Sequence, residues 1–562
     1  MKKITILLLA ITFYTASYSQ TPLPNQLQEF LAAIDNCLLT NPVDGLCTNS
    51  QYGEMPDWDV SSVTDMQQAF ANKENFNADI SQWNVSNVSI MRNMFFGAHS
   101  FNQDITGWNT ANVSVMDQMF YEAYVFNQSI GTWDTSNVID MYYMFYEASS
   151  FDGDISSWNV SNVTNMASMF NGASSFNQPI GSWQTNSVAN MEKMFNSATS
   201  FNQSLNDWDT SSVTNMQAMF NNASVFNQSL NGWDTSNVVN MIKMFYEASA
   251  FDGDISNWDT SNVSDMRSLF RGASVFNGDI GYWDVSNVSI MRNMFFGAHL
   301  FNQQLNDWDT SNVTIMLDMF AGASAFNQSL NDWDTSNVTS MYGMFAEASI
   351  FNGDITDWDV SSVIDMTYMF FRANNFNQPL NDWDIGNVIY TTNMFAEASA
   401  FNGDISSWDI SSVTNMGSMF SLSGFSTNNY DAILNSWSQQ DVQSGVVLGA
   451  FGVNYCNGAD ARQSLEDNNG WIITDAGLDC STASIDDQNQ LDISIYPNPT
   501  SDIVYIDGNY TQLKVIIYNV LGKEILNKSI TNSIDISHLD NGVYILQLSD
   551  GVKLSTRKII KN

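Results

Sequence analysis

The sequence predicts an α/β solenoid of 25-residue units, followed by a small all-β sandwich domain. Trp recurs 15 times at a fixed spacing of 25 residues, from Trp58 to Trp408. Within each unit, the apolar positions indicate a short extended segment and then one face of a short helix. After the last unit the strong acidic excess ends, and alternating apolar runs typical of strands take over.

Three further columns keep the same spacing as Trp. Val lies five residues after every Trp, Met lies eight residues after it except at Thr391, and Phe lies twelve residues after it. A second Phe lies eighteen residues after each of the first 14 Trp, so the two Phe columns take 29 of the chain's 36 Phe. A strict period of this kind predicts units that contact only their neighbours and stack equivalent side chains. The excess of aromatic residues is therefore expected to form the core of the array and not a binding surface.

The unit at 205–229 illustrates the expected local structure. Residues 205–213 read as an extended segment with a turn. The apolar residues that follow are spaced i, i+3, i+4 and i+7, which predicts a short helix: Met216, Met219, Phe220 and Ala223. Asn follows the second Phe in 12 of 14 units, and Asp does so in the other two. A stacked Asn column is expected to satisfy backbone groups at a repeated corner.

The N-terminal segment predicts export. Residues 1–19 combine a basic start, an apolar stretch at 4–13 that is too short to span a bilayer, and small residues before a cut after Ser19. This pattern is typical of a signal peptide, and an N-terminal anchor helix is the alternative. No later run of 18 apolar residues occurs, so we expect no transmembrane segment in the mature chain. In an exported chain, the four cysteines predict two local disulfides, Cys37–Cys47 and Cys456–Cys480.

The segments around the repeats predict caps and a separate tail. A solenoid needs its open ends covered. An amphipathic helix is expected at 25–36, and two further helices are expected at 430–437 and 459–471. Strands are expected at 502–507, 513–520 and 542–548. The predicted organisation is an N-terminal cap at 20–54, a solenoid at 55–425, a C-terminal cap at 426–482, a polar linker at 483–490 and a β-sandwich at 491–562.

The repeated pattern resembles a known family. L-x-x-W-D-[VT]-S-x-V-x-x-M-x-x-M-F, repeated over 55–425, resembles the BspA-type leucine-rich-repeat surface proteins of bacteria. The resemblance implies a right-handed, leucine-rich-repeat-like solenoid and a secreted or cell-surface binding role. Trp replaces the usual second Leu and Met replaces later ones, so the curvature of a standard horseshoe does not follow.

The tail carries a second resemblance. YPNPTSDIVYI (496–506), YNVLGKEI (518–525), LDNGVYILQL (539–548) and STRKIIKN (555–562) resemble the type A C-terminal sorting domain of type IX secretion. This resemblance implies a Bacteroidota-type bacterium, engagement with the type IX secretion machinery, passage across the outer membrane and removal of the tail. An ordinary stabilising β-module is the alternative.

Composition and motifs exclude several function classes. With 18 basic and 59 acidic residues, the formal charge is −41, which excludes a basic nucleic-acid surface and electrostatic attachment to an anionic membrane. The sequence shows no nucleophile–base pair, phosphate loop or zinc-spaced cluster. VSNVSIMRNMFFGAH occurs at both 85–99 and 285–299, as expected of a binding array and not of a unique catalytic site. We therefore expect no enzyme, and we expect His99 and His299 to be surface residues.

Two Asp columns raise the question of calcium. Asp follows Trp in 11 of 15 units, and a second column lies four residues before Trp in seven units. Stacked like charges repel, and oxygen-rich surfaces suit Ca²⁺. The simpler expectation is that each carboxylate accepts the N–H two residues on. We predict no cofactor, with structural calcium as the alternative.

A variable column offers candidate contact residues. Thirteen residues after Trp lie Phe96, Tyr121 and Tyr146 in consecutive units, and later Tyr246, Phe296 and Phe371. Tyr142 and Tyr143 extend the first group. Partly exposed aromatics in a row can bind protein or stack on sugars, although they can also simply pack on the adjacent unit. The sequence predicts a secreted or cell-surface repeat protein for adhesion or protein–protein interaction with an extracellular ligand. The alternative is a carbohydrate-binding surface protein that uses the aromatic column for a glycan.

Overall fold

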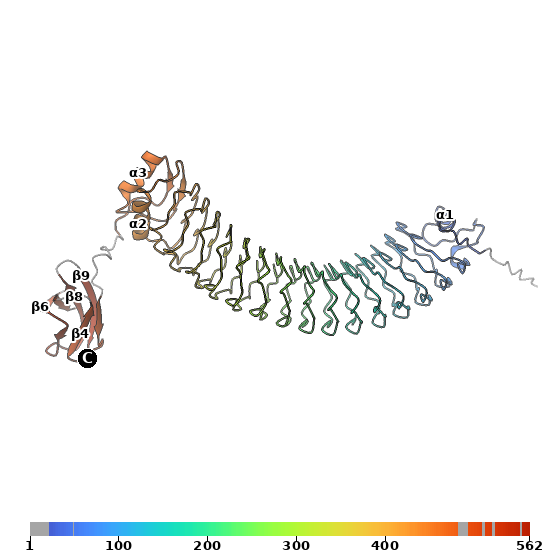
Figure 1. Cartoon of the computed structure of the whole chain (residues 1–562), viewed down its shortest axis with the longest axis horizontal. Helices are drawn as coiled ribbons and strands as arrows, with labels where there is room; N and C mark the ends of the chain where they lie inside the picture. The colour runs from blue at the N-terminus through green and yellow to red at the C-terminus, as the bar shows by residue number, and fades with distance from the viewer. Residues whose placement is uncertain (1–21, 49, 482–492, 509–511, 520–522, 551–553) are drawn as a thin grey trace, which may run out of the picture. The chain divides into compact units, whose positions relative to one another are not determined.

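The computed structural model describes residues 22–48, 50–481, 493–508, 512–519, 523–550 and 554–562. The predicted signal peptide and the predicted linker at 483–490 lie outside the described residues. The chain divides into two compact units, one ending at Leu478 and the other beginning at Asp479. The first holds the repeats, which Figure 1 shows as coils lying side by side in one row. Helix α1 (Leu27–Leu38) lies at one end of the row, and helices α2 (Thr427–Trp437) and α3 (Ala459–Asn469) lie at the other.

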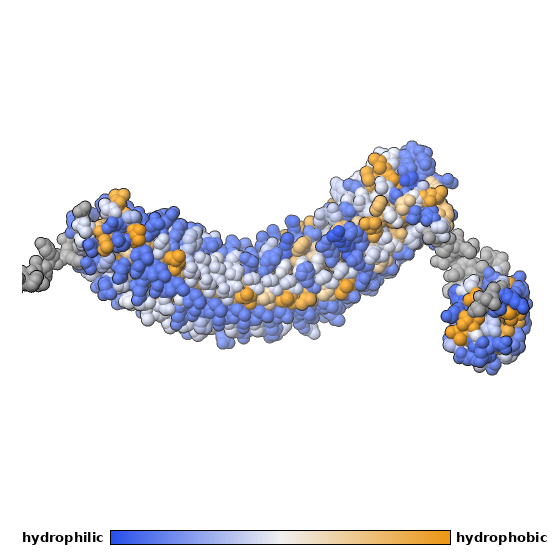
Figure 2. Space-filling view, turned by 180° about the vertical axis from the view of Figure 1, so that it is seen from behind, coloured by the Kyte–Doolittle hydropathy of each residue, from blue (hydrophilic) through white to orange (hydrophobic). Residues whose placement is uncertain are grey.

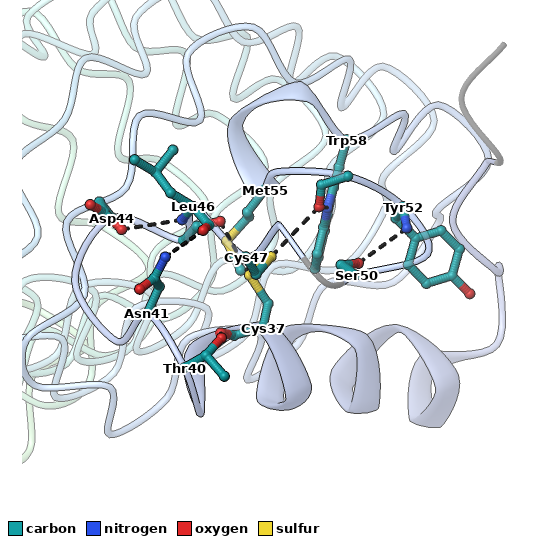
Figure 3. Close-up of a disulfide and its surroundings, with 12 residues drawn as sticks. Cys37, Thr40, Asn41, Asp44, Leu46, Cys47, Ser50, Tyr52, Met55 and Trp58 are labelled. Atoms are coloured by element: carbon teal, nitrogen blue, oxygen red, sulfur yellow. Dashed lines mark hydrogen bonds between the residues drawn. A yellow bond between two sulfur atoms is a disulfide. The ribbon is translucent and has the colours of Figure 1, made fainter. Parts of the chain in front are cut away.

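A helix and a disulfide form the N-terminal end of the row. Helix α1 (Leu27–Leu38) confirms the helix predicted at 25–36 and buries Phe30, Ile34 and Leu38. The Cys37–Cys47 disulfide is present and ties the end of α1 to the loop that follows it (Figure 3). A 3₁₀ turn, η1 (Met55–Asp57), leads into the first unit. The indole N–H of Trp58 donates to Gly53 O at 2.9 Å, which fixes this loop against the first unit.

Backbone hydrogen bonds join each unit to the next through alternate residues. In the unit at 205–229, the N–H groups of Met216, Ala218, Phe220 and Asn222 donate to carbonyls of the following unit at 2.6–2.9 Å. The residues between them close turns within the unit instead; Met219 N, for example, donates to Met216 O at 3.2 Å. Parallel bridges seven residues after Trp, such as Asn190 to Asn215, run along the row. This alternation satisfies the whole segment, as buried backbone groups require.

The predicted helix within each unit is wrong. Over residues 58–425, all of which the structure describes, there is neither an α-helix nor an extended strand. In every one of the 15 units the residues ten and fourteen after Trp have left-handed backbone, for example Ala218 (φ 52°) and Asn222 (φ 57°). These residues break a helical ladder and turn their N–H groups toward the neighbouring unit. Consecutive three-residue turns then reproduce the i, i+3, i+4, i+7 spacing, so α/β does not describe the array.

Aromatic ladders fill the interior and confirm the predicted columns. The Trp233 ring lies 6.4 Å from Trp208 and 6.2 Å from Trp258, nearly parallel to both. From Trp83 to Trp408, each of 14 indole N–H groups donates to a main-chain carbonyl of the preceding unit; Trp233 Nε1 donates to Leu205 O at 2.8 Å. Within a unit the two Phe rings also stack, with centroids 4.1 Å apart for Phe220 and Phe226. The Trp therefore supplies both apolar volume and the hydrogen bond that a buried carbonyl needs.

The Asn column forms the predicted corner ladder. Asn202 Oδ1 accepts from Asn227 N at 2.9 Å, and Asn227 Oδ1 accepts from Asp252 N at 2.8 Å. The same bond recurs along the column, and Asn402 Oδ1 accepts from Ser426 N at its end. Each side chain thus satisfies a backbone N–H of the next unit, as predicted.

The C-terminal end continues the inter-unit ladder. Helices α2 (Thr427–Trp437) and α3 (Ala459–Asn469) confirm the helices predicted at 430–437 and 459–471. Two short parallel strands that the sequence did not predict, β1 (Val447–Gly449) and β2 (Ile472–Thr474), lie between and after them. Phe420 N donates to Gly449 O at 2.9 Å, so β1 takes the place that a sixteenth unit would occupy. Cys456 and Cys480 are both disulfide-bonded.

The second unit consists of two antiparallel sheets around one core. Three strands pair in the order β3-β4-β7, and four pair in the order β6-β5-β8-β9. Their bounds are β3 Ile493–Tyr496, β4 Ile503–Gly508, β5 Leu513–Asn519, β6 Glu524–Ile530, β7 Ser533–Asp535, β8 Gly542–Ser549 and β9 Leu554–Lys561. Val504 and Ile506 of one sheet share a buried cluster with Val515 and Leu546 of the other. The strands predicted at 502–507, 513–520 and 542–548 are confirmed.

Candidate binding surface

The column thirteen residues after Trp lies at the edge of the core. Each of its residues directly follows the buried first Phe and precedes a left-handed residue, and the side chain is half-buried in 12 of the 15 units. Phe96 and Tyr121 stack with centroids 4.4 Å apart and planes 7° apart, and Tyr121 and Tyr146 stack at 4.5 Å and 8°. The fixed spacing of the units therefore holds three aromatic rings in one continuous stack.

Tyr142 and Tyr143 join this stack. The Tyr143 ring lies 5.9 Å from Tyr121 and 5.0 Å from Tyr146, and Tyr142 meets it edge-on at 4.0 Å. Tyr143 occupies a left-handed position (φ 55°), which directs its side chain beside the column. The structure thus brings all five predicted residues, Phe96, Tyr121, Tyr142, Tyr143 and Tyr146, into one cluster, which we call the aromatic cluster.

Two further residues extend the surface beside the cluster. The His99 and Tyr124 rings, both sixteen residues after a Trp, stack with centroids 4.6 Å apart. His99 Nε2 lies 3.8 Å from Glu122 Oε2, and Tyr124 is 38% exposed. The sequence predicted His99 only as a surface residue. The shared offset of sixteen residues is the signal that would have paired it with Tyr124.

Tyr121 and Tyr142 of the cluster are neutral hydrogen-bond donors. Burial raises the pKa of Tyr121 to about 12, with smaller contributions from Tyr146 and Glu122. Burial and a hydrogen bond with Tyr143 likewise raise the pKa of Tyr142 to about 12. Both hydroxyls therefore keep their protons across the physiological range. Together with half-exposed apolar rings, this gives an amphipathic surface of the kind found in protein interfaces.

Stacking decides which parts of the rings are open to a ligand. Phe96 covers one face of Tyr121 and Tyr146 covers the other, so Tyr121 offers only its edge and hydroxyl. A sugar that stacks on an aromatic face has no free face at Tyr121. Edge contacts and hydroxyl hydrogen bonds to a protein partner remain available.

The same column contains a cation farther along the array. Arg271 lies between Tyr246 and Phe296, its guanidinium carbon 5.5 Å and 4.4 Å from the two ring centroids. Phe371 follows three units after Phe296 and has Arg372 above its ring at 4.7 Å. A guanidinium therefore takes the place of a ring in this stack.

Figure 2 shows that hydrophilic residues cover most of the face in view, with hydrophobic residues gathered in short runs along the row.

A protein-family model matches the repeats in five overlapping segments, residues 45–149, 127–233, 214–333, 276–378 and 325–437. Its description is "Mycoplasma protein of unknown function, DUF285". The chain belongs to this family. A second model, the secretion system C-terminal sorting domain, matches residues 494–562. The comparison with curated proteins found no match.

The sorting domain places the DUF285 array outside the cytoplasm. The protein is secreted or displayed at the cell surface of a Bacteroidetes-type bacterium. The domain also implies engagement with secretion machinery. Among the residues described above, no helix is both long enough and apolar enough to cross a membrane.

The Asp columns of the DUF285 array make local hydrogen bonds. Asp234 Oδ1 accepts from Ser236 N at 3.0 Å and from Ser236 Oγ at 2.6 Å. The column four residues before Trp behaves alike; Asp254 Oδ1 accepts from Ser256 N at 3.0 Å, and all seven of its Asp make this bond. Within the described ranges, no group of three His, Cys, Asp or Glu residues is placed to hold a metal ion. Each of these Asp side chains thus has a partner two residues along the chain.

These turns predict a pH-dependent contribution to the stability of the DUF285 array. The Ser hydroxyl and N–H lower the pKa of Asp234, so folding favours its ionised form. The contribution is complete above the ordinary Asp pKa and is lost as the pH falls through the lower, folded value. The pKa is lowered by the same kind of Ser contacts at five further sites of this column, Asp59, Asp134, Asp309, Asp359 and Asp409.

A charge-neutral variant isolates this effect. Replacing the Ser partners of all these Asp residues except Asp59 by Ala should lower the melting temperature at pH 6, and the difference from wild type should shrink between pH 4 and pH 2. The five substitutions are Ser136→Ala, Ser236→Ala, Ser311→Ala, Ser361→Ala and Ser411→Ala. Differential scanning calorimetry across this range measures the difference. A constant difference would show that the hydroxyls do not act through the carboxylates.

Proposed function

We propose that the protein is a non-enzymatic adhesion protein that contacts an extracellular protein ligand through the aromatic cluster. The observation that carries this proposal is the cluster itself, in which the fixed unit spacing assembles five aromatic residues into one half-exposed surface. Aromatic residues of this kind dominate the binding energy of protein interfaces. The duplicated segment at 85–99 and 285–299 supports an array whose length adds surface.

We also propose the finer assignments of fold and export. The inter-unit ladders and parallel bridges support a right-handed, leucine-rich-repeat-like solenoid of the BspA type. The match over 494–562, with its two antiparallel sheets, supports a type A sorting domain of type IX secretion. Under this proposal the array binds the ligand and the tail is the sorting signal for secretion.

Carbohydrate binding is the competing function, and the stack weighs against it at this cluster. Sugar rings bind to aromatic faces, whereas both faces of Tyr121 are covered by neighbouring rings. The outer faces of Phe96 and Tyr146 are the remaining places for a sugar in this stack. A glycan array with the purified protein therefore tests the alternative directly.

The double variant Tyr121→Ala/Tyr146→Ala tests the proposed surface. Adhesion to immobilised matrix and cell-envelope proteins should fall at least about tenfold, because each lost aromatic anchor removes on the order of 1–2 kcal/mol of binding. Asn196→Ala/Asn221→Ala is the matched control, since both Asn occupy the same unit position in consecutive units. Unchanged adhesion of the Tyr double variant would contradict the proposal. Glycan binding that disappears with the two Tyr would favour the carbohydrate alternative.

A further inference from the structure

In the later part of the array, the column thirteen residues after Trp carries Ala in two consecutive units. Thirteen residues after Trp, Ala321 and Ala346 stand between Phe296 and Phe371. The missing rings leave an open recess of about 610 Å³ on the array surface, lined by Phe296, Phe371, Ala321 and Ala346 among others. With a rung spacing of about 4.8 Å, two absent rings leave room for one or two planar groups in the stack.

Small residues keep the floor of the recess open. Gly297 (φ 68°) and Gly322 (φ 70°) occupy left-handed positions where most other units carry a side chain. The position of a Cβ on Gly322 is 3.6 Å from Gly297 Cα, so the two backbones stack with no side chain over them. Glycine at this position therefore both permits the backbone and exposes it.

Aromatic rings form the walls. Arg271 covers one face of Phe296 at 4.4 Å, and the next residue of the column on the other side is Ala321. At the far end, Tyr368 meets Tyr342 at 5.7 Å and Phe371 at 5.5 Å, both edge-on. Phe296 thus has a free face directed along the column, unlike Tyr121, which is stacked on both sides.

Three carboxylates line the recess. Glu247, Asp318 and Glu347 line it, together with His299, whose Nδ1 lies 2.9 Å from Gly322 O. Glu347 pairs with Arg372 at 3.2 Å. Burial raises the pKa of Asp318, and the charges of Arg292 and Arg271 oppose that shift. A site that joins free aromatic faces to carboxylates favours a cationic ligand.

The chain supplies a precedent for the ligand. One unit before Phe296, the guanidinium of Arg271 fills the place of a ring, 5.5 Å from Tyr246 and 4.4 Å from Phe296. We propose that the recess binds an arginine side chain of a basic protein partner, which completes the column on the other face of Phe296 and lies near the Asp318 and Glu347 carboxylates. This inference rests on the proposed function, since it names the chemistry of a partner for the same array.

Arginine fits the recess better than lysine or a sugar. Its guanidinium is planar, stacks on aromatic faces and offers a fork of donors to carboxylates, whereas a lysine ammonium is a hydrated point charge. The charge of −41 on the chain also attracts a basic partner at low salt. Peptide binding should therefore weaken as salt is added.

A variant that fills the recess provides the test. Binding of a fluorescent, arginine-containing peptide to the full chain is measured by anisotropy, against the same peptide with citrulline or lysine in place of arginine. Ala321→Tyr should weaken arginine-peptide binding at least about tenfold, because a ring then occupies the place of the guanidinium. The stack of Phe96, Tyr121 and Tyr146, at the same unit position, shows that the column accepts Tyr.

Ala396→Tyr is the matched control, because it adds the same ring to the same column beyond Phe371 and outside the recess. It should leave peptide binding unchanged. Asp318→Asn removes a lining charge without adding volume, so it should also weaken peptide binding. It therefore tests the inference even if Ala321→Tyr perturbs the fold. A melting temperature for each variant separates loss of binding from loss of structure.

The outcomes that overturn the inference are specific. Equal binding of the arginine and citrulline peptides, no binding to wild type, or full binding to Ala321→Tyr would each refute it. Neutral glycans that bind wild type and not Ala321→Tyr would assign the recess to sugars instead. Adhesion through the aromatic cluster is measured on the same variants, so a failure here with adhesion retained leaves the proposed function standing.

Discussion

Trp233→Ala should lower the free energy of unfolding by about 3–5 kcal/mol, the range for deleting a large buried aromatic side chain. The Trp233 ring is 3% exposed and stacks between Trp208 and Trp258. Its loss leaves a void and also removes the hydrogen bond to Leu205 O at 2.8 Å. Because each unit contacts only its neighbours, the defect should reduce coupling between the two halves of the array and broaden its unfolding transition.

Two comparison variants separate the contributions in this prediction. Trp233→Phe keeps a ring and removes the indole donor, so it should cost less than the Ala variant. Tyr282→Ala removes an aromatic side chain that is 82% exposed, and it should change stability by less than about 0.5 kcal/mol. Urea unfolding followed by Trp fluorescence and circular dichroism measures all three. A Trp233→Ala chain as stable as wild type would mean that the Trp column is not the core of the array.

The sequence predicted which residues are buried in the array better than it predicted the backbone that buries them. The 25-residue spacing identified the Trp, Val, Met and Phe columns, and all of them lie in one core. The spacing of Met216, Met219, Phe220 and Ala223 predicted a helix because a helix is the commonest way to place such residues on one face. Hydrophobic spacing reports the direction of side chains and carries no information on where the N–H groups point.

The left-handed residues explain the failure. Eleven residue types fill positions ten and fourteen after Trp in different units, so no single type marks them: Gln, Asn, Glu, Ser, Lys, Tyr, Gly, Ala, Asp, Arg and Leu. Non-Gly residues adopt this conformation only where the surrounding structure imposes it. Here the neighbouring unit imposes it by accepting the N–H, for example of Asn222 at 2.6 Å. A contact between units cannot be read from the pattern within one unit.

The sequence likewise predicted part of the candidate site and missed another part. Equal offsets in consecutive units predicted that Phe96, Tyr121 and Tyr146 would be neighbours, and the structure stacks them. The recess at Ala321 and Ala346 was overlooked because it is a place where aromatic residues are absent. The recess forms because small residues thirteen and fourteen positions after Trp, in consecutive units, lie next to one another in space.

Removal of residues 491–562 should stop the protein from reaching the cell surface while leaving the array folded. The two compact units have separate buried clusters in the described part of the chain: one runs through the repeats and caps to Ile473, and the other begins at Ile493. A unit with its own core can fold alone and act as an address. The truncated chain should therefore keep the cooperative melt of the array and its ligand binding, and it should accumulate in the periplasm. Surface protease accessibility in the source organism measures display, and circular dichroism measures folding.

A point variant makes the same test without shortening the chain. Val504 is fully buried between the two sheets of the tail, so Val504→Asp places an unpaired carboxylate in their shared core and should unfold this unit alone. It should reproduce the loss of display, whereas Tyr505→Ala, at a position next to it that is 45% exposed, should not. Normal display of the truncated chain would refute the sorting role of the tail. Loss of the array's melt on truncation would show that the tail is instead a structural cap, because folding of the repeats would then depend on a unit that shares none of their core.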